Sequence, residues 1–473
     1  MKQAKPTTAT TKDEGAPQGA KRSAGASDVQ EPNDLFDQVQ AIELGARALF
    51  IHPYVKRSVT RRTPESSMEE LLSLGDAIEL QAVQQEFCAL SAIKPSTYMG
   101  RGKVEEMASI VAALDVEVVI MNCALSPIQQ RNLERELHTK VIDRTALILE
   151  IFGARAQTRE GVMQVQLAHL SYQRGRLVRS WTHLERQRGG AGFMGGPGER
   201  QIEADRRALD ESIGRLTKQL EKVTRTRELH RKGRQKTPYP VVALVGYTNA
   251  GKSTLFNRLT NADVFAEDQL FATLDPTMRE VTLESGRQII LSDTVGFISD
   301  LPTHLVAAFR ATLEEVIQAD IIIHVRDISH IETAEQREDV LEILNDLGIK
   351  DYDEHEMIEI HNKIDLLDHE INSGLVADKP KETPIQFCAI DGRGEADLLQ
   401  RIDDILAVGS HDLRVRVPHD QGEALSWLYR HGDVLARDDK PEGTEFQVRL
   451  TQADLGRMQK MDGIEILSSS AKQ

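Results

Sequence analysis

Residues 241–259 read VVALVGYTNAGKSTLFNRL, and this stretch decides the fold of the central part of the chain. The apolar run 241–245 is typical of a buried parallel strand. It leads directly into a GxxxxGKS motif at 246–253 and then into a helix-forming segment, which is the strand–loop–helix setting of a phosphate-binding loop. The stretch therefore predicts an α/β domain that binds a nucleotide.

The residue types of this loop suit the binding of a triphosphate. Glycines let backbone N–H groups close around the phosphates, and the following helix points its positive end at them. We expect Lys252 to bridge the β- and γ-phosphates as a catalytic group, and Ser253 to hold Mg²⁺ through its hydroxyl. The loop residues expected to contact the nucleotide are Gly246, Tyr247, Thr248, Asn249, Ala250, Gly251, Lys252, Ser253 and Thr254.

Two downstream motifs identify the nucleotide as GTP. A DxxG motif begins 47 residues after the start of the phosphate loop, where Asp293 is placed to hold Mg²⁺ through water and the N–H of Gly296, a second catalytic candidate, to meet the γ-phosphate. An NKxD motif begins 69 residues later. Its Asp365 can accept from the N1–H and the exocyclic amine of guanine, a pairing that adenine cannot offer. Lys363 would lie along the base, and Asn362 would tie the loop to the phosphate side.

Two positions depart from signalling GTPases and bear on mechanism. Such GTPases place a water-orienting Gln directly after DxxG, whereas this chain has Phe297, so intrinsic hydrolysis is expected to be slow without a partner or an ion. Asn249 lies where some GTPases recruit K⁺ to do the work of an arginine finger; a loop-stabilising role for this Asn is the equally weighted alternative.

Residues 160–232 have apolar positions at steps of three, four and seven, which predicts two long antiparallel helices. The joining loop 189–198 holds six glycines. The loop and its flanks suit single-stranded RNA, because arginines meet phosphates and an aromatic ring stacks on bases; a flexible linker is the alternative. The RNA-binding candidates are Arg186, Arg188, Phe193 and Arg200.

Charge separates this arm from the rest of the chain. The whole chain has a formal net charge of −16, which alone argues against nucleic-acid partners. The segment 172–236, however, holds 17 Lys and Arg against 8 Asp and Glu, a net +9, so the remainder carries −25. A chain polarised in this way can hold a phosphate-binding face while it repels polyanions elsewhere.

The remaining segments complete a multidomain α/β organisation for the 473 residues. Before the arm, we expect strands at 48–51 and 116–120 and helices at 68–80, 103–114 and 128–137, which suggests a small parallel α/β unit. Its GRGK loop at 100–103 lacks the full phosphate-loop spacing, and such glycines are usually turn residues, so ATP binding and hydrolysis by this unit stay open. The expected parts are a disordered tail (1–34), the N-terminal α/β subdomain (35–159), the helical hairpin (160–232), a Ras-like GTPase domain (233–408) and a small α+β module (409–473) with strands at 413–417 and 445–450.

Composition excludes several classes of protein. No run approaches 18 consecutive apolar residues, so no membrane-spanning segment is expected, and the first 34 residues lack the apolar core of a signal peptide. The three cysteines have no CxxC spacing, so neither a disulfide framework nor a zinc knuckle fits. We therefore expect a cytoplasmic protein.

The stretch 188–207, which contains RGGAGFMGGPGE, is similar to the glycine-rich signature of the HflX family of ribosome-associated GTPases, within the Obg–HflX group. The resemblance covers nearly everything from about residue 45 to residue 408. It implies that 268–277 is switch I, with Thr273 as the catalytic threonine and second Mg²⁺ hydroxyl and Thr277 as the reserve. It also implies a guanine-side loop formed by Cys388, Ala389 and Ile390, with Cys388 in place of the usual Ser.

The resemblance further implies a monomeric Mg²⁺-dependent GTPase that cycles between GTP and GDP and binds the large ribosomal subunit and its rRNA. Such a protein would split or rescue stalled ribosomes, with the arm pushed towards the peptidyl-transferase region. The alternative is a nucleotide-gated module for RNA or a membrane surface, in which hydrolysis is incidental. A tRNA-modifying GTPase lacks support because no second catalytic cluster is visible.

Overall fold

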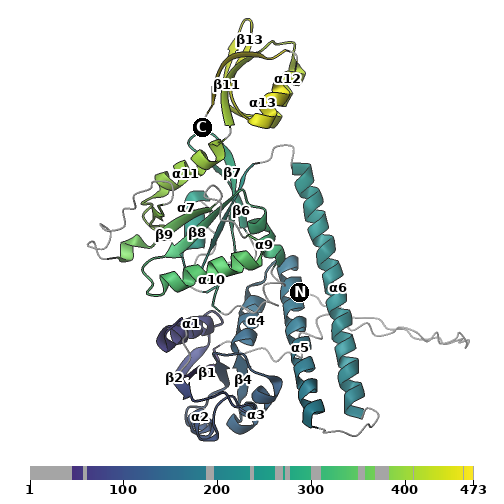
Figure 1. The fold of residues 1–473 in the computed structure, drawn as a ribbon, viewed down its shortest axis with the longest axis vertical. Helices are drawn as coiled ribbons and strands as arrows, with labels where there is room; N and C mark the ends of the chain where they lie inside the picture. Colours follow the sequence, from purple (N-terminus) through teal and green to yellow (C-terminus); the bar gives the residue numbers. More distant parts are fainter. Residues whose placement is uncertain are drawn as a thin grey trace, which may run out of the picture. The chain divides into compact units, whose positions relative to one another are not determined.

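The computed structural model describes residues 45–56, 61–187, 197–234, 239–260, 270–271, 277–299, 310–349, 357–367, 383–408, 410–461 and 463–471. Figure 1 gives the order of the elements along the chain. The predicted disordered tail lies outside the described residues.

The N-terminal unit is a small, fully parallel sheet covered by helices, as the alternating pattern predicts. Its strands are β1 (Arg47–Val55), β2 (Gln81–Leu90), β3 (Val118–Met121) and β4 (Lys140–Asp143), in the order β2-β1-β3-β4. Its helices are α1 (Pro64–Asp76), α2 (Arg101–Ala113), α3 (Pro127–Leu137) and α4 (Arg144–Arg155). Apolar residues of α1 and α4 pack on one face of the sheet, and those of α2 and α3 pack on the other.

The arm is a helical hairpin. Helices α5 (Arg159–Gln187) and α6 (Pro197–Arg234) lie side by side (Figure 1), which confirms the two long helices predicted from the apolar periodicity. The base of the arm contacts the N-terminal unit, because α5 packs on α3 and α4.

The third unit is a six-stranded sheet in the order β10-β9-β8-β5-β7-β6, with only β6 antiparallel to its neighbour. Its strands are β5 (Val241–Gly246), β6 (Thr277–Thr282), β7 (Gln288–Asp293), β8 (Ile321–Asp327), β9 (Met357–Asn362) and β10 (Ile385–Gln386). The helices described in full or in part are α7 (Lys252–Thr260), α9 (Arg310–Ile317), α10 (Thr333–Asp346) and α11 (Glu395–Ala407). Each predicted central strand is present, and the chemistry-bearing motifs follow the carboxyl ends of β5, β7 and β9.

The C-terminal module is a four-stranded antiparallel sheet in the order β12-β13-β11-β14. It consists of β11 (Ser410–Val417), α12 (Gly422–His431), β12 (Asp433–Lys440), β13 (Gly443–Thr451), α13 (Gln452–Met458) and β14 (Glu465–Ala471). Both helices pack on one apolar face of the sheet. The α+β prediction for this module is confirmed.

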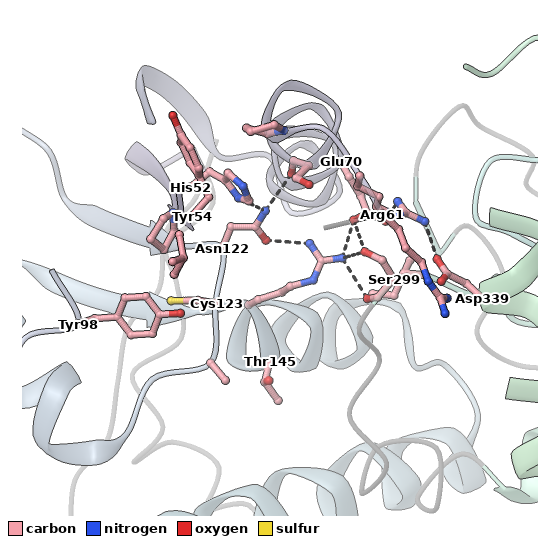
Figure 2. A pocket seen from close by; sticks show the side chains of 18 of the residues that line it. His52, Tyr54, Arg61, Glu70, Tyr98, Asn122, Cys123, Thr145, Ser299 and Asp339 are labelled. Atoms are coloured by element: carbon pink, nitrogen blue, oxygen red, sulfur yellow. Dashed lines mark hydrogen bonds and ion pairs between the residues drawn. The ribbon is translucent and has the colours of Figure 1, made fainter. Parts of the chain in front are cut away.

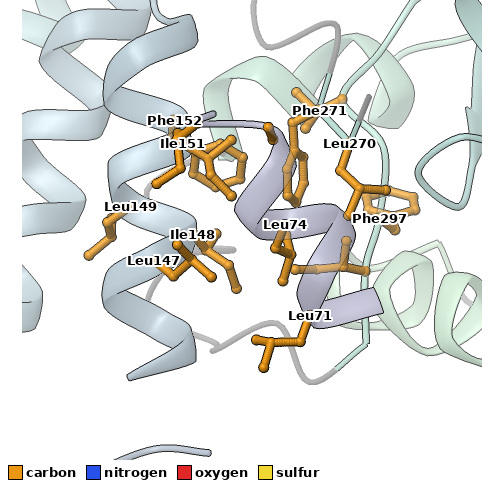
Figure 3. Close-up of a cluster of buried hydrophobic side chains, with 14 of the residues drawn as sticks. Leu71, Leu74, Leu147, Ile148, Leu149, Ile151, Phe152, Leu270, Phe271 and Phe297 are labelled. Atoms are coloured by element: carbon orange, nitrogen blue, oxygen red, sulfur yellow. The ribbon is translucent and has the colours of Figure 1, made fainter. Parts of the chain in front are cut away.

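A buried apolar cluster joins the N-terminal unit to the third unit (Figure 3). Leu74 of α1 and Phe152 of α4 pack with Leu270, Phe271 and Phe297, and the rings of Phe152 and Phe271 meet edge to face at 4.6 Å. The residue that follows DxxG is thus part of a core that two units share, and its environment depends on both.

Candidate nucleotide site

The loop between β5 and α7 has the tight packing that a phosphate cradle requires. At Gly246 (φ +155°) a Cβ atom would lie 2.2 Å from the carbonyl oxygen of Val325, and at Gly251 (φ +92°) it would lie 2.2 Å from Nδ2 of Asn362. Only glycine fits at both positions, because a side chain would collide with backbone or with the NKxD motif. The loop backbone is therefore pressed against β8 on one side and the guanine motif on the other.

Lys252 begins α7 and lies deep in this loop. Its side chain is buried, and Nζ donates to the carbonyl oxygens of Tyr247 (2.7 Å) and Gly246 (3.2 Å). Burial lowers the pKa of Lys252 to about 8, although Asp293 nearby opposes the shift. The hydroxyl of Thr248 is also buried and has no hydrogen-bond partner among the described residues. A buried ammonium and an unused hydroxyl in one cradle fit an anionic ligand.

The donors predicted for Mg²⁺ lie together. Ser253 Oγ donates to Asp293 Oδ2 at 2.7 Å, and Asp293 is fully buried at the end of β7. Hydroxyl and carboxylate oxygens are the ligand types that Mg²⁺ takes, so this donor set fits the ion. Thr273 lies outside the described residues, whereas its reserve, Thr277, begins β6 in register with Asp293.

The segment after DxxG is bonded to the phosphate loop. The N–H of Phe297 donates to Gly246 O (3.1 Å), and the N–H of Thr248 donates to Phe297 O (2.8 Å). At Gly296 a Cβ atom would lie 2.7 Å from Thr248 Cγ2 and 3.0 Å from Lys252 Nζ, so only glycine fits between them. The Phe297 ring is buried in the apolar cluster of Figure 3, so it offers no polar group for orienting water.

The guanine motif and the 388–390 loop meet beside the phosphate loop. Asn362 Nδ2 donates to Ala250 O (2.8 Å), and Asn362 Oδ1 accepts from the N–H of Ala389 (3.1 Å), so one amide ties both loops together. Lys363 has a left-handed backbone (φ +63°) and pairs with Asp327 at 2.8 Å. The structure therefore brings together the phosphate loop, NKxD and the 388–390 loop.

The thiol of Cys388 lies beside Asp365 of the NKxD motif. Its Sγ donates to Asp365 Oδ1 at 3.2 Å, and burial raises the pKa of the thiol, which keeps the proton on sulfur. The side chain of Ile390 is 77% exposed at the rim of this loop.

Arg258 of α7, which belongs to none of the sequence motifs, contacts the same loop. Its guanidinium donates to the carbonyl oxygens of Ile390 (3.0 Å) and Asp391 (3.2 Å) and pairs with Glu395 (2.6 Å). The guanidinium lies so close over Gly392 (φ +88°) that a Cβ atom there would be 1.9 Å from Nη2. Helix α7 therefore begins at Lys252 and contacts the 388–391 loop through Arg258, six residues further along.

A second missed group, Glu70 of α1, belongs to the N-terminal unit (Figure 2). Its carboxylate accepts from the hydroxyl of Tyr247, from Ser299 Oγ (2.6 Å) and from Arg144 (2.6 Å). Burial alone would raise the pKa of Glu70, but Arg144 and the hydroxyl donors hold it at about 2. Because these residues come from distant parts of the sequence, no local pattern could have found the cluster. A cavity of about 1080 Å³ opens beside it, at the carboxyl ends of β1 and β3.

Among the other sequence candidates, the structure describes the side chain of Lys103. Lys103 of the GRGK loop pairs with Glu86 and Glu106, as a surface lysine of a helix start does. Of the RNA-binding candidates, Arg188 and Phe193 lie outside the described residues, as do the side chains of Arg186 and Arg200. Within the described part of the chain, no helix is long and apolar enough to cross a membrane, and no cluster of three or more His, Cys, Asp or Glu side chains could hold a metal ion.

Comparisons with known proteins agree along most of the chain. Four family models match in succession: GTP-binding GTPase N-terminal (65–153), GTP-binding GTPase middle region (155–234), 50S ribosome-binding GTPase (241–363) and HflX C-terminal domain (376–466). GTPase HflX of Magnetococcus marinus is 49% identical over 86% of this chain and 94% of its own length. GTPase HflX of Escherichia coli is 41% identical over 90% of this chain and 98% of its own length. A solved GTP-binding protein of Sulfolobus solfataricus in complex with GDP is 23% identical, with a TM-score of 0.42 over 76% of this chain and 98% of that chain.

Proposed function

Because the chain belongs to the HflX family of GTPases, we propose that it grips the large ribosomal subunit through its helical arm when GTP is bound, and that it thereby splits or rescues stalled ribosomes. The partner follows from the family description, a 50S ribosome-binding GTPase. The cytoplasm, where ribosomes are, is the proposed location.

In the proposed cycle, Lys252 exchanges its two backbone carbonyl partners for the β- and γ-phosphates. Charge-assisted bonds to phosphate are stronger than bonds to neutral carbonyls, which favours the exchange. Gly296 then offers its N–H to the γ-phosphate, while Asp365 accepts from the guanine edge. Ser253, Asp293 and a switch I threonine, Thr273 or Thr277, would hold Mg²⁺, which supplies neutralisation of the phosphate charge when bound.

Hydrolysis by the free protein is proposed to be slow. Phe297 is buried and apolar, so nothing at that position holds the attacking water. Asn249 is exposed with a left-handed backbone (φ +58°) in the phosphate loop, where its side-chain oxygen is available to a K⁺ ion. Turnover faster in K⁺ than in Na⁺ is the expected result, and equal rates would remove K⁺ from the mechanism.

The observation that carries the ribosome proposal is the charge of the arm. The segment 172–236 is the basic part of an otherwise acidic chain, and it contains the later part of α5 and all of α6. A basic segment in an otherwise acidic chain is suited to rRNA phosphates.

The test is GTP turnover with and without purified large subunits. The proposal expects turnover to rise by about 10³-fold or more on the subunit, in the range by which activating partners stimulate slow GTPases. Turnover that large subunits leave unchanged would contradict it, and would favour the module in which hydrolysis is incidental.

A further inference from the structure

Two segments of the nucleotide site converge on one carboxylate of the N-terminal unit. The phosphate loop reaches Glu70 through the hydroxyl of Tyr247, and the segment after DxxG reaches it through Ser299 Oγ at 2.6 Å. The two segments also bond to each other here, since the N–H of Ser299 donates to the Tyr247 hydroxyl at 2.7 Å. A displacement of either segment therefore changes the partners of Glu70.

Arg144 closes the network on its other side. It donates to Glu70 (2.6 Å), to Ser299 Oγ (2.8 Å) and to Ser299 O (3.2 Å). Glu70, Arg144 and Ser299 are each exposed by 10% or less, so the loss of one of these charge-assisted hydrogen bonds is costly. Such a network has few acceptable arrangements, which is the property that a mechanical link requires.

The residue beside Arg144 holds the arm. Asp143 is buried, and its carboxylate accepts from the Tyr172 hydroxyl of α5 at 2.9 Å. Arg176, one turn further along α5, donates to the same hydroxyl (2.5 Å) and lies 3.6 Å from Asp143. Asp143 also accepts from the N–H of Ala146 at the start of α4 (2.8 Å), so the two neighbouring side chains share one rigid helix start.

Binding of a triphosphate in the phosphate site would change a hydrogen bond of the Tyr247 backbone. In the structure Lys252 Nζ donates to the carbonyl oxygen of Tyr247 at 2.7 Å, and a bound triphosphate would take that ammonium away. Tyr247 therefore has its backbone in the phosphate site and its buried hydroxyl in the N-terminal unit.

We infer that Glu70 and Arg144 are positioning residues that couple the phosphate site to helix α5 of the arm, through Tyr247 and Ser299 on one side and Asp143 with Tyr172 on the other. They touch no nucleotide group themselves. This inference rests on the proposal that the bound nucleotide governs the arm. Its test uses no ribosome, so a failure of ribosome binding and a failure of this link are told apart.

The experiment measures backbone amide exchange in residues 159–176 of the full chain, without nucleotide, with GDP and with a non-hydrolysable GTP analogue. In the wild type the exchange rates should differ between the empty and triphosphate states by about fivefold, the low end of usual coupling between sites. Glu70→Gln removes the charge at the site end, and Tyr172→Phe removes one hydroxyl at the arm end. Both should reduce that difference to less than about twofold.

Tyr54→Phe is the matched control, because Tyr54 lines the same cavity and its ring is stacked with that of His52, which is not one of the residues of the proposed link. It should keep the wild-type difference. If Glu70→Gln fails to fold, Tyr172→Phe alone decides, with GDP affinity as the check that its nucleotide site is intact. A wild-type arm that exchanges alike in all three states, or a Tyr172→Phe arm that keeps the full difference, would overturn the link.

Discussion

At the scale of single residues, the burial of Lys252 in the candidate nucleotide site makes the charged form of its amine costly. Lys252 is placed among backbone carbonyls, and burial lowers its pKa to about 8. A bound phosphate would favour the charged amine and raise the pKa again, so nucleotide affinity and protonation are linked.

The first prediction concerns the pH dependence of that affinity. Well below pH 8 the free lysine is already protonated, whereas above pH 8 binding must be accompanied by proton uptake, so GDP affinity should fall by about fivefold between pH 8 and pH 9. Titration calorimetry in buffers of different ionisation enthalpy measures both the affinity and the proton uptake. An affinity that stays constant to pH 9 would contradict the assignment, and Lys252→Ala should lose both tight binding and its pH dependence.

The second prediction concerns Arg258, whose guanidinium holds the base-side loop on α7. Arg258→Ala should speed GDP release and raise the KM for GTP by about tenfold, as expected for lost charge-assisted hydrogen bonds, while kcat at saturation persists. Arg258→Lys keeps the positive charge but loses the forked guanidinium. Its GDP release rate and its KM for GTP should therefore lie between those of the wild type and those of Arg258→Ala.

Arg279→Ala is the control for Arg258, because Arg279 is an exposed arginine that donates to the carbonyl of its neighbour Met278. GDP release from that variant should match the wild type. If Arg258→Ala releases GDP at the wild-type rate, its guanidinium does not position the loop.

Motif residues and positioning residues differ in how far the sequence reveals them. Lys252, Asn362 and Asp365 stand at fixed spacings behind apolar strands, so the meeting of their motifs at one edge of the sheet could be predicted from the chain alone. Arg258 and Glu70 act through contacts between segments far apart in the sequence, and nothing local distinguishes them from surface charges. The resemblance implies a loop with Cys388 in place of a Ser, and the structure shows a thiol hydrogen bond from this residue to Asp365.

At the scale of elements, the start of α4 is capped by the carboxylate of Asp143, which also accepts hydrogen bonds from other segments. Asp143 is the N-cap of the helix, accepts from the N–H of Leu125 and anchors Tyr172 of the arm.

The third prediction is therefore that Asp143→Ala lowers the free energy of unfolding by about 2–4 kcal/mol, the sum of a lost cap and of buried donors left without a partner. Thr63→Ala removes the N-cap of α1 alone and should cost about 1 kcal/mol. Urea unfolding of both variants makes the comparison. Equal losses would mean that Asp143 is no more than a helix cap.

The strands that could be predicted differ from the missed ones mainly in how deeply their side chains are buried. The central strands β5 and β8 of the third sheet are continuous apolar runs, which is why the strand at 241–245 could be predicted. The prediction missed β2 and β14 because both are largely exposed and polar, and β4 because it has four residues. Helix α4 was missed as well, since its buried apolar residues follow directly on that short strand. Pairing partners, which the sequence does not display, decide such edge and short strands.

At the scale of the whole molecule, charge is divided between a basic arm and an acidic remainder. The apolar periodicity predicts the hairpin, and the structure contains it. The joint between arm and nucleotide site could not be predicted, because it depends on the side-chain network around Glu70 and Asp143.

The fourth prediction follows from this division. Replacing Arg186, Arg188 and Arg200 together with Gln should weaken binding to large subunits and reduce the slope of log affinity against log salt by roughly two, because about 0.7 counterions are released per phosphate contact with single-stranded RNA. GDP affinity should stay the same. Filter binding across a salt series measures the slope, and an unaltered slope would remove the arm tip from RNA recognition.

The central claim is that the bound nucleotide decides when the arm grips the large subunit. Co-sedimentation of the full chain with purified large subunits tests it most directly, in parallel samples with no nucleotide, with GDP and with a non-hydrolysable GTP analogue. We expect the protein in the triphosphate sample to pellet with the subunit at concentrations where the protein in the GDP and nucleotide-free samples stays in the supernatant. Equal pelleting in all three samples would contradict it.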